Sequence, residues 1–251
     1  MAFLKSGNPV LSEKSFSDSL LELNQERMTA RGTINKFGLL FIMVLGAASF
    51  TWSLFYQGVN VMPFAIGSAI GGFVLAIIIA FKKTWAPYLA LGYALLEGFF
   101  IGAISAVFNY AFAESYPGIV MQAVLLTLGT AAAMYGLYHF RIIQATPTFK
   151  KVIYTATAGI AIFYLIALVL RLFGIQMPYL HDNGMIGIGI SLFIVTIAAL
   201  NLILDFDKIE QGAAHGASKY FEWYCAFGLL VTLVWLYLEM LRLLSKLASR
   251  D

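Results

Sequence analysis

Hydrophobic residues form seven long stretches between about residue 37 and the C-terminus, and almost every stretch is long enough to cross a bilayer. A membrane-spanning helix needs about 20 mostly apolar residues, whereas the strand of a membrane barrel would alternate in polarity over about 10 residues. Helices also satisfy their own backbone hydrogen bonds in lipid. The pattern therefore predicts an all-α integral membrane protein, a seven-transmembrane-helix bundle, with spans at Phe37–Tyr56, Val61–Phe81, Pro87–Ala113, Gly118–Phe140, Val152–Phe173, Met185–Leu204 and Phe221–Leu244.

Composition excludes a soluble protein. The chain is 61% hydrophobic and 12% charged, whereas soluble domains have about 45–50% apolar and about 25% charged residues. The length of 251 residues leaves room for one transmembrane domain, residues 35–251, after a cytosolic N-terminal tail, residues 1–34. The single cysteine, Cys225, rules out an internal disulfide. The net charge of +3 comes from basic residues at span ends, so we expect no nucleic-acid partner, and the bilayer itself is the expected partner.

Basic residues lie mainly on one side of the predicted membrane. Lys and Arg occupy the N-terminal tail and the second-to-third, fourth-to-fifth and sixth-to-seventh connections, and such residues favour the cytoplasmic side. We therefore predict a multi-pass protein of the cell (inner) membrane with a cytoplasmic N-terminus. Seven spans then place Arg242, Lys246 and Arg250 outside, against the same rule. A shallow or re-entrant last segment is the alternative.

Glycine pairs indicate close helix packing. Gly67 and Gly71 lie four residues apart in the second span, as do Gly98 and Gly102 in the third. Small residues let helix backbones approach closely in lipid. We expect these pairs to pack within the chain, with dimerisation as the alternative.

Ionisable residues inside the spans are few, and such residues usually face a partner or a water-filled cavity. Carboxylates are oxygen ligands suited to hard cations such as Ca²⁺, and two close carboxylates titrate as a unit. They therefore suggest a proton-controlled cation gate, without a fixed metal site and without a cofactor. The candidate acids are Glu97 in the third span, Asp205 and Asp207 at the inner end of the sixth, and Glu239 deep in the seventh.

Each candidate also has a structural interpretation. Glu97 can be neutral and hydrogen-bonded to a neighbouring helix, and Asp205 and Asp207 can be interfacial charges near Lys208. Glu239 can form an ion pair with Arg171, because the two lie at similar depth in their spans. Glu222, which opens the seventh span, is a further possible partner for one of these charges.

The chain resembles the Bax inhibitor family, in its bacterial YccA-like branch. The resemblance rests on the seven spans, the short tail, and a sixth span that ends in Leu-Asp-Phe-Asp-Lys-Ile, with Asp205 followed by Ile209. It covers most of the chain. It implies a pH-sensitive cation leak, chiefly for Ca²⁺, in which an aspartate of the sixth span, here Asp205, pairs with an acid of the seventh. Local similarity of Leu-Tyr-Leu-Glu places the second acid at Glu239.

Helix geometry opposes that pair. If the chain turns near Gly212 to Gly216, Asp205 and Glu239 differ in depth by roughly 20 Å at about 1.5 Å per residue. The residues of the seventh span at the same depth as Asp205 lie near Glu222 or Tyr224. If the alignment with the family is anchored on Cys225 instead, the position of the second acid holds an apolar residue near Val231. The acid pair is then absent or rearranged, with Glu97 as a substitute.

Three classes of function follow. The first is a passive, pH-sensitive cation leak, for Ca²⁺ or another cation, gated by these carboxylates. The second is a non-transporting scaffold or modulator of another membrane protein of unknown identity, bound through the tail and the connections. An enzyme is disfavoured, because His139, His181 and His215 all lie at span ends or in connections, away from any buried nucleophile.

Overall fold

A computed structural model describes residues 27–174 and 184–249 of the chain. The described residues form seven helices that are long and apolar enough to cross a membrane, joined by short connections and one 3-10 turn, η2 (Lys83–Trp85), and they contain no β-strand. This confirms the predicted all-α seven-helix architecture. The helices are α2 (Ala30–Tyr56), α3 (Met62–Phe81), α4 (Ala86–Ala111), α5 (Ile119–His139), α6 (Pro147–Leu172), α8 (Met185–Ala214) and α9 (Tyr220–Ala248).

Several helices extend beyond the apolar stretches of the sequence. Helix α2 begins at Ala30 rather than Phe37, inside the expected tail, because the Thr29 side chain accepts a hydrogen bond from the Gly32 backbone N–H and caps the helix. Helix α8 continues past Leu204 to Ala214, and Gly216 follows it with a positive φ of 65°, the usual way to end a helix. Hydropathy detects the part of a helix that is apolar and misses polar turns beyond it.

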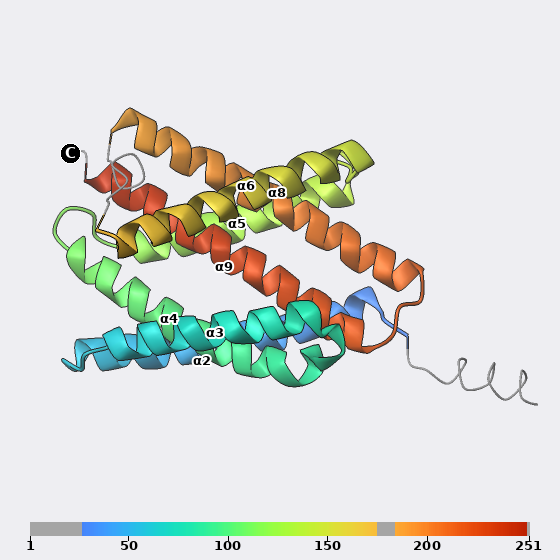
Figure 1. The fold of residues 1–251 in the computed structure, drawn as a ribbon, viewed down its shortest axis with the longest axis horizontal. Coiled ribbons are helices and arrows are strands. Elements are labelled where there is room, and N and C mark those ends of the chain that lie inside the picture. Colours follow the sequence, from blue (N-terminus) through green and yellow to red (C-terminus); the bar gives the residue numbers. More distant parts are fainter. Residues whose placement is uncertain (1–26, 175–183, 250–251) are drawn as a thin grey trace, which may run out of the picture.

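Helix α9 is the centre of the bundle (Figure 1). It contacts α2 and α4 on one side and α5 and α8 on the other. One core cluster joins α9 to α5 and α8, and a second joins it to α2 and α4. Helix α3 packs on α4, and α6 packs on α8, so both lie at the periphery. The last helix in the chain therefore holds the two halves together.

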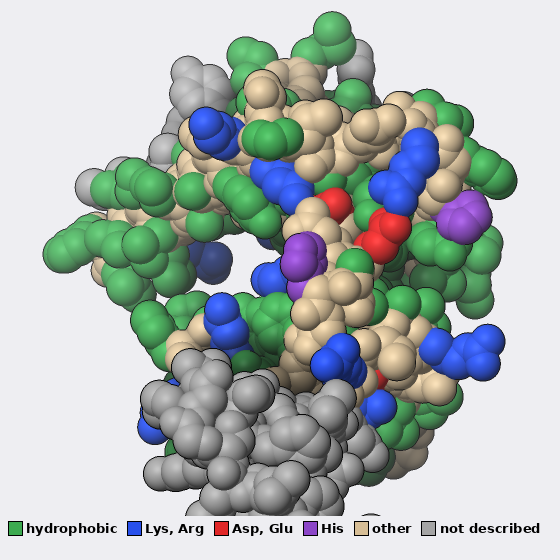
Figure 2. Space-filling model, turned by 90° about the vertical axis from the view of Figure 1, so that its right-hand side faces the viewer, with side chains coloured by type: hydrophobic (Ala, Val, Ile, Leu, Met, Phe, Trp, Pro, Cys, Tyr) green, Lys and Arg blue, Asp and Glu red, His purple; other side chains and the backbone are tan. Residues whose placement is uncertain are grey.

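The two ends of the bundle differ in charge. We call the end that holds the start of α2 and the α3–α4, α5–α6 and α8–α9 connections the basic end. Figure 2 views this end, and blue Lys and Arg side chains lie around it with few red acidic ones. The described basic residues at this end are Arg27, Arg31, Lys36, Lys82, Lys83, Arg141, Lys150, Lys151, Lys208 and Lys219.

Helix α9 runs through the whole bundle, and its C-terminus lies at the end opposite the start of α2 (Figure 1). The last segment is therefore a full-length helix of the bundle and not a shallow segment. Two of the three basic residues that conflicted with the charge rule are bound within the protein: half-buried Arg242 binds the Glu239 carboxylate, and buried Lys246 donates to the Gly187 carbonyl oxygen at 2.9 Å. The third, Arg250, lies outside the described residues. Charges engaged in this way differ from the free loop charges on which the rule rests.

Gly98 and Gly102 of α4 pack directly on α2. A Cβ at Gly102 would lie 2.2 Å from the Ala48 carbonyl oxygen, and one at Gly98 would lie 2.5 Å from that of Val44. This confirms intramolecular packing for that pair. In the other pair, Gly67 has open space where a Cβ would be.

Candidate functional site

Asp205 lies on α8 where that helix packs on α9. Its Oδ2 atom is buried and has no hydrogen-bond partner among the described residues. A buried carboxylate oxygen without a partner costs free energy, so a group of this kind is a candidate for binding a proton or a cation. Lys208, the nearest cation on the same helix, points its Nζ over the Tyr224 ring at 4.9 Å.

Thr232 is the α9 side chain that faces the Asp205 carboxyl group. Its hydroxyl has one hydrogen to donate, and that hydrogen also has the Gly228 carbonyl oxygen as an acceptor at 3.2 Å. Thr232 therefore satisfies the carboxylate incompletely. The α9 position opposite Asp205 therefore holds a neutral hydroxyl rather than a second acid, one residue from the Val231 position of the alternative alignment.

Glu239 is engaged elsewhere in the bundle. Its side chain is 2% exposed. Arg242 donates to its two carboxylate oxygens at 2.7 and 2.9 Å, and the Tyr164 hydroxyl of α6 donates at 2.8 Å. The expected pairs of Glu239 with Arg171 or with Asp205 are therefore replaced by a pair within α9. Arg171 lies exposed at the end of α6.

Glu222 is fully buried at the first turn of α9 and binds the start of α2. Its Oε1 accepts from the Thr29 backbone N–H at 2.8 Å and from the Thr29 hydroxyl at 3.0 Å. Lys36 binds Oε2, and Lys219 lies 3.5 Å from Oε1. These contacts join the first and last described helices at the basic end, so the structure gives Glu222 an anchoring position and not the partnership with Asp205 that matched depth suggested.

Asp207 and Glu210 bind cations from the α5–α6 region. Asp207 lies 2.5 Å from the Lys150 Nζ, and Glu210 lies 2.6 Å from an Arg141 nitrogen. Both pairs tie the end of α8 to its neighbours. The expected partner of Asp207, Lys208, is thus replaced by Lys150.

Glu97 lies in the middle of α4 and faces α3. Its Oε2 is 3.6 Å from where a Cβ on Gly72 would be, so the glycine makes room for the carboxyl group. Tyr93 lies beside the same carboxyl group, one turn earlier, and the Tyr93 ring packs edge-on against Phe227 of α9 with ring centres 4.8 Å apart. Glu97 takes part in none of the salt bridges that the described residues form.

The six acids described above therefore divide into two sets. Asp207, Glu210, Glu222 and Glu239 each bind a cation, whereas Asp205 and Glu97 lie in the bundle without one. No group of three or more His, Cys, Asp or Glu in the described segments is placed to hold a metal ion together.

Sequence reasoning did not single out Thr232 or Tyr164. The spacing of Glu239 and Arg242, three apart on one helix face, was a signal for their pair. Thr232 had no such signal, because its role depends on the register between α8 and α9.

Comparison with known families gives one match. A family model described as Bax inhibitor 1 like matches residues 8–249. Comparison with curated proteins and with solved structures finds no match.

Proposed function

The chain belongs to the Bax inhibitor 1 like family, and we propose that this membrane protein is a passive, pH-sensitive cation leak with Ca²⁺ as a conducted ion. In this proposal Asp205 is the gating carboxylate, and the protein is not an enzyme and binds neither cofactor nor nucleic acid. It resides in the bacterial inner membrane with the basic end facing the cytoplasm, as a member of the YccA-like branch. The charge asymmetry of the two ends supports that orientation.

One observation carries the proposal. The Asp205 Oδ2 atom is buried at the α8–α9 contact without a hydrogen-bond partner among the described residues. A cation or a proton at this oxygen would supply the missing interaction. Rings or sets of acidic oxygens that replace part of an ion's hydration shell are a common basis of cation selectivity.

A single carboxylate suits a leak better than a storage site. Ca²⁺ in a tight site takes six to eight oxygen ligands, several of them from carboxylates. Asp205 and the Thr232 hydroxyl provide few of these. Conduction needs an ion to leave as readily as it enters, so weak binding at Asp205 is consistent with passive movement of Ca²⁺ through the bundle.

The proposed pH sensitivity follows from the charge of Asp205. Protonation would remove the charge that attracts a cation and would let the carboxyl group donate a hydrogen bond. Lys208 on α8, and Thr232 and Cys225 on α9, lie near this carboxyl group. We propose Glu97 as a second acid on the ion path, because it also lies in the bundle without a bound cation.

The test is Ca²⁺ uptake into liposomes that hold the purified protein, measured from mildly acidic to mildly alkaline pH. We expect uptake that changes with pH in the native chain and loses that dependence in Asp205→Asn. Glu210→Gln is the matched control, since it removes an α8 acid whose carboxylate is exposed and bound to Arg141. The leak is refuted if native protein gives no more uptake than empty liposomes.

If no flux occurs, the alternative is a scaffold or modulator of another membrane protein. One observation favours it: the Met28 backbone N–H donates to the Ala217 carbonyl oxygen at 2.7 Å, and Arg27 pairs with Ser218. These contacts hold Arg27 and Met28, the first described residues, against the α8–α9 connection. A partner that is lost on deletion of residues 1–26, without any intrinsic flux, would support this alternative.

A further inference from the structure

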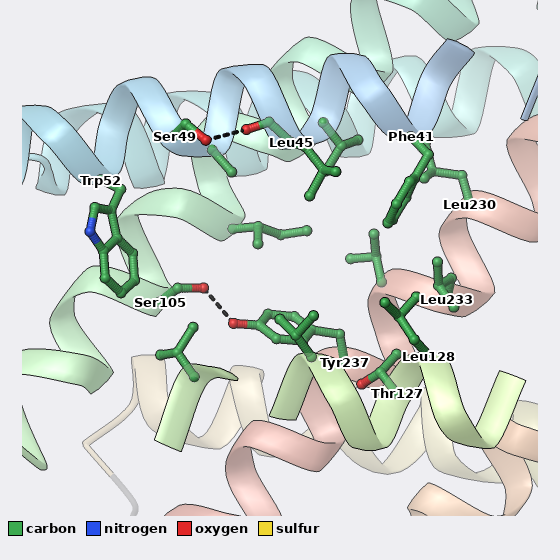
Figure 3. Close-up of a pocket in the computed structure, with 16 residues that line it drawn as sticks. Phe41, Leu45, Ser49, Trp52, Ser105, Thr127, Leu128, Leu230, Leu233 and Tyr237 are labelled. Atoms are coloured by element: carbon green, nitrogen blue, oxygen red, sulfur yellow. Dashed lines mark hydrogen bonds between the residues drawn. The ribbon is translucent and has the colours of Figure 1, made fainter. Parts of the chain in front are cut away.

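A large apolar cavity lies between α2, α4, α5 and α9, and Asp205 is not among the residues that line it (Figure 3). It has a volume of about 370 Å³. Phe41 stands toward one end of the cavity and Trp52 toward the other. The wall opposite α2 comes from the first half of α5, and α9 provides the floor.

The cavity opens sideways, toward the lipid. Helices α2 and α5 both pack on α9 but have little direct contact with each other over the described residues. Leu45 of α2 and Leu128 of α5 both line the cavity, yet they are 50% and 41% exposed. The cavity surface is therefore continuous with the apolar outer surface that faces the bilayer.

The hydroxyl groups of the cavity wall are already satisfied. The Ser105 and Tyr237 hydroxyls hydrogen-bond to each other at 2.6 Å. The hydroxyls of Ser49 and Thr127 donate to backbone carbonyl oxygens one turn earlier. A polar ligand would find few partners here, so the occupant that fits this chemistry is a hydrocarbon.

The position of the cavity indicates the leaflet. Phe41 and Trp52 are eleven residues apart on α2, or about 16 Å at about 1.5 Å per residue. This is close to one half of a hydrocarbon core of about 30 Å. Trp52 lies near the end of α2 that is opposite the basic end, where tryptophan rings prefer the membrane interface.

We propose that this cavity binds one acyl chain of a phospholipid from the leaflet opposite the basic end. The acyl chain enters between α2 and α5 and extends past Trp52 toward Phe41, and the lipid headgroup stays outside the cavity. It supplies the contacts that α2 and α5 do not make with each other. An apolar space of this size without an occupant leaves its lining side chains without packing partners.

The experiment is native mass spectrometry of the full chain released from phospholipid nanodiscs of defined composition. We expect one phospholipid to remain bound to each native chain. Val124→Phe, which fills the cavity from α5, removes that adduct. Leu125→Phe, a neighbouring residue that is 62% exposed and does not line the cavity, retains it and controls for the added ring.

A second measurement covers the case in which Val124→Phe does not fold. A variant with Trp52 as its single tryptophan, carrying Trp85→Phe, Trp223→Phe and Trp235→Phe, is placed in nanodiscs whose lipid has brominated acyl chains, which quench tryptophan fluorescence. Leu45→Phe, from the α2 wall, should reduce the quenching of Trp52, whereas Ile42→Phe should not.

The proposal is overturned if no phospholipid remains bound to the native chain, or if the cavity-filling and control variants retain it equally. It is also overturned if the retained mass is a second copy of the chain, or if Trp52 quenching is the same in both α2 variants.

Discussion

Replacement of Glu222 should destabilise the protein more than replacement of any exposed acid at the basic end. In Glu222→Ala, the Thr29 backbone N–H and hydroxyl lose their acceptor, and Lys36, whose side chain is only 18% exposed, loses its counter-ion. Breaking a buried ion pair by removing one partner costs about 3–5 kcal/mol. For a chain of this size, that corresponds to a decrease in unfolding temperature of roughly 6–20 °C.

Cys225 provides the assay. It is the single cysteine of the chain and is buried one turn from Glu222, so a thiol-reactive dye should label it only when α9 separates from its neighbours. Labelling during a temperature ramp in detergent then reports unfolding. Glu210→Ala is the control, because the Glu210–Arg141 pair is about half exposed, and such pairs contribute about 1 kcal/mol or less.

Glu222→Gln should fall between the two, because the amide oxygen still accepts from Thr29 while the charge that binds Lys36 is lost. Equal shifts for Glu222→Ala and Glu210→Ala, or no shift for Glu222→Ala, would refute the argument that the buried contacts at the start of α9 hold α2.

Three further variants test other parts of the bundle. Gly102→Ala should lower the unfolding temperature strongly, because the added Cβ would collide with the α2 backbone. Gly129→Ala has open space at that point, so it should leave the unfolding temperature unchanged or raise it through helix propensity. The same dye ramp compares the two variants. Thr232→Asp should increase Ca²⁺ binding to the purified protein, since it places a second carboxylate opposite Asp205. If calorimetry found Ca²⁺ binding unchanged, that would contradict the assignment of Thr232 as the side chain that faces Asp205. Glu239→Gln should lower the unfolding temperature by leaving the half-buried Arg242 guanidinium without its carboxylate, again measured in the dye ramp.

The architecture could be predicted because apolar length is a strong signal. All seven stretches became helices, and the largest differences lie at ends where polar residues continue the helix. The start of α2 at Ala30 depends on the Thr29 cap and on Glu222, which is 193 residues away from Thr29 in the sequence. Contacts of that separation cannot be read from local hydropathy.

The sequence was enough to name the candidate acids, but it did not predict most of the cations that bind them. A buried acid is conspicuous in an apolar span, and so Asp205, Glu97 and Glu239 could be named. Which cation each one meets depends on helix rotation and on register. Asp207 binds Lys150 from another helix, and Glu239 binds Arg242 on its own, although a residue of equal depth, Arg171, was available in the sequence.

The central place of α9 has a consequence for biosynthesis. Helices α2, α4, α5 and α8 all contact α9, yet they precede it in the chain and leave the ribosome first. Until α9 enters the membrane, both core clusters lack the helix that joins them, and the start of α2 lacks its Glu222 acceptor. Assembly of this bundle is therefore completed by its last helix, and a nascent chain interrupted before Tyr220 presents membrane quality control with six helices that have no common core.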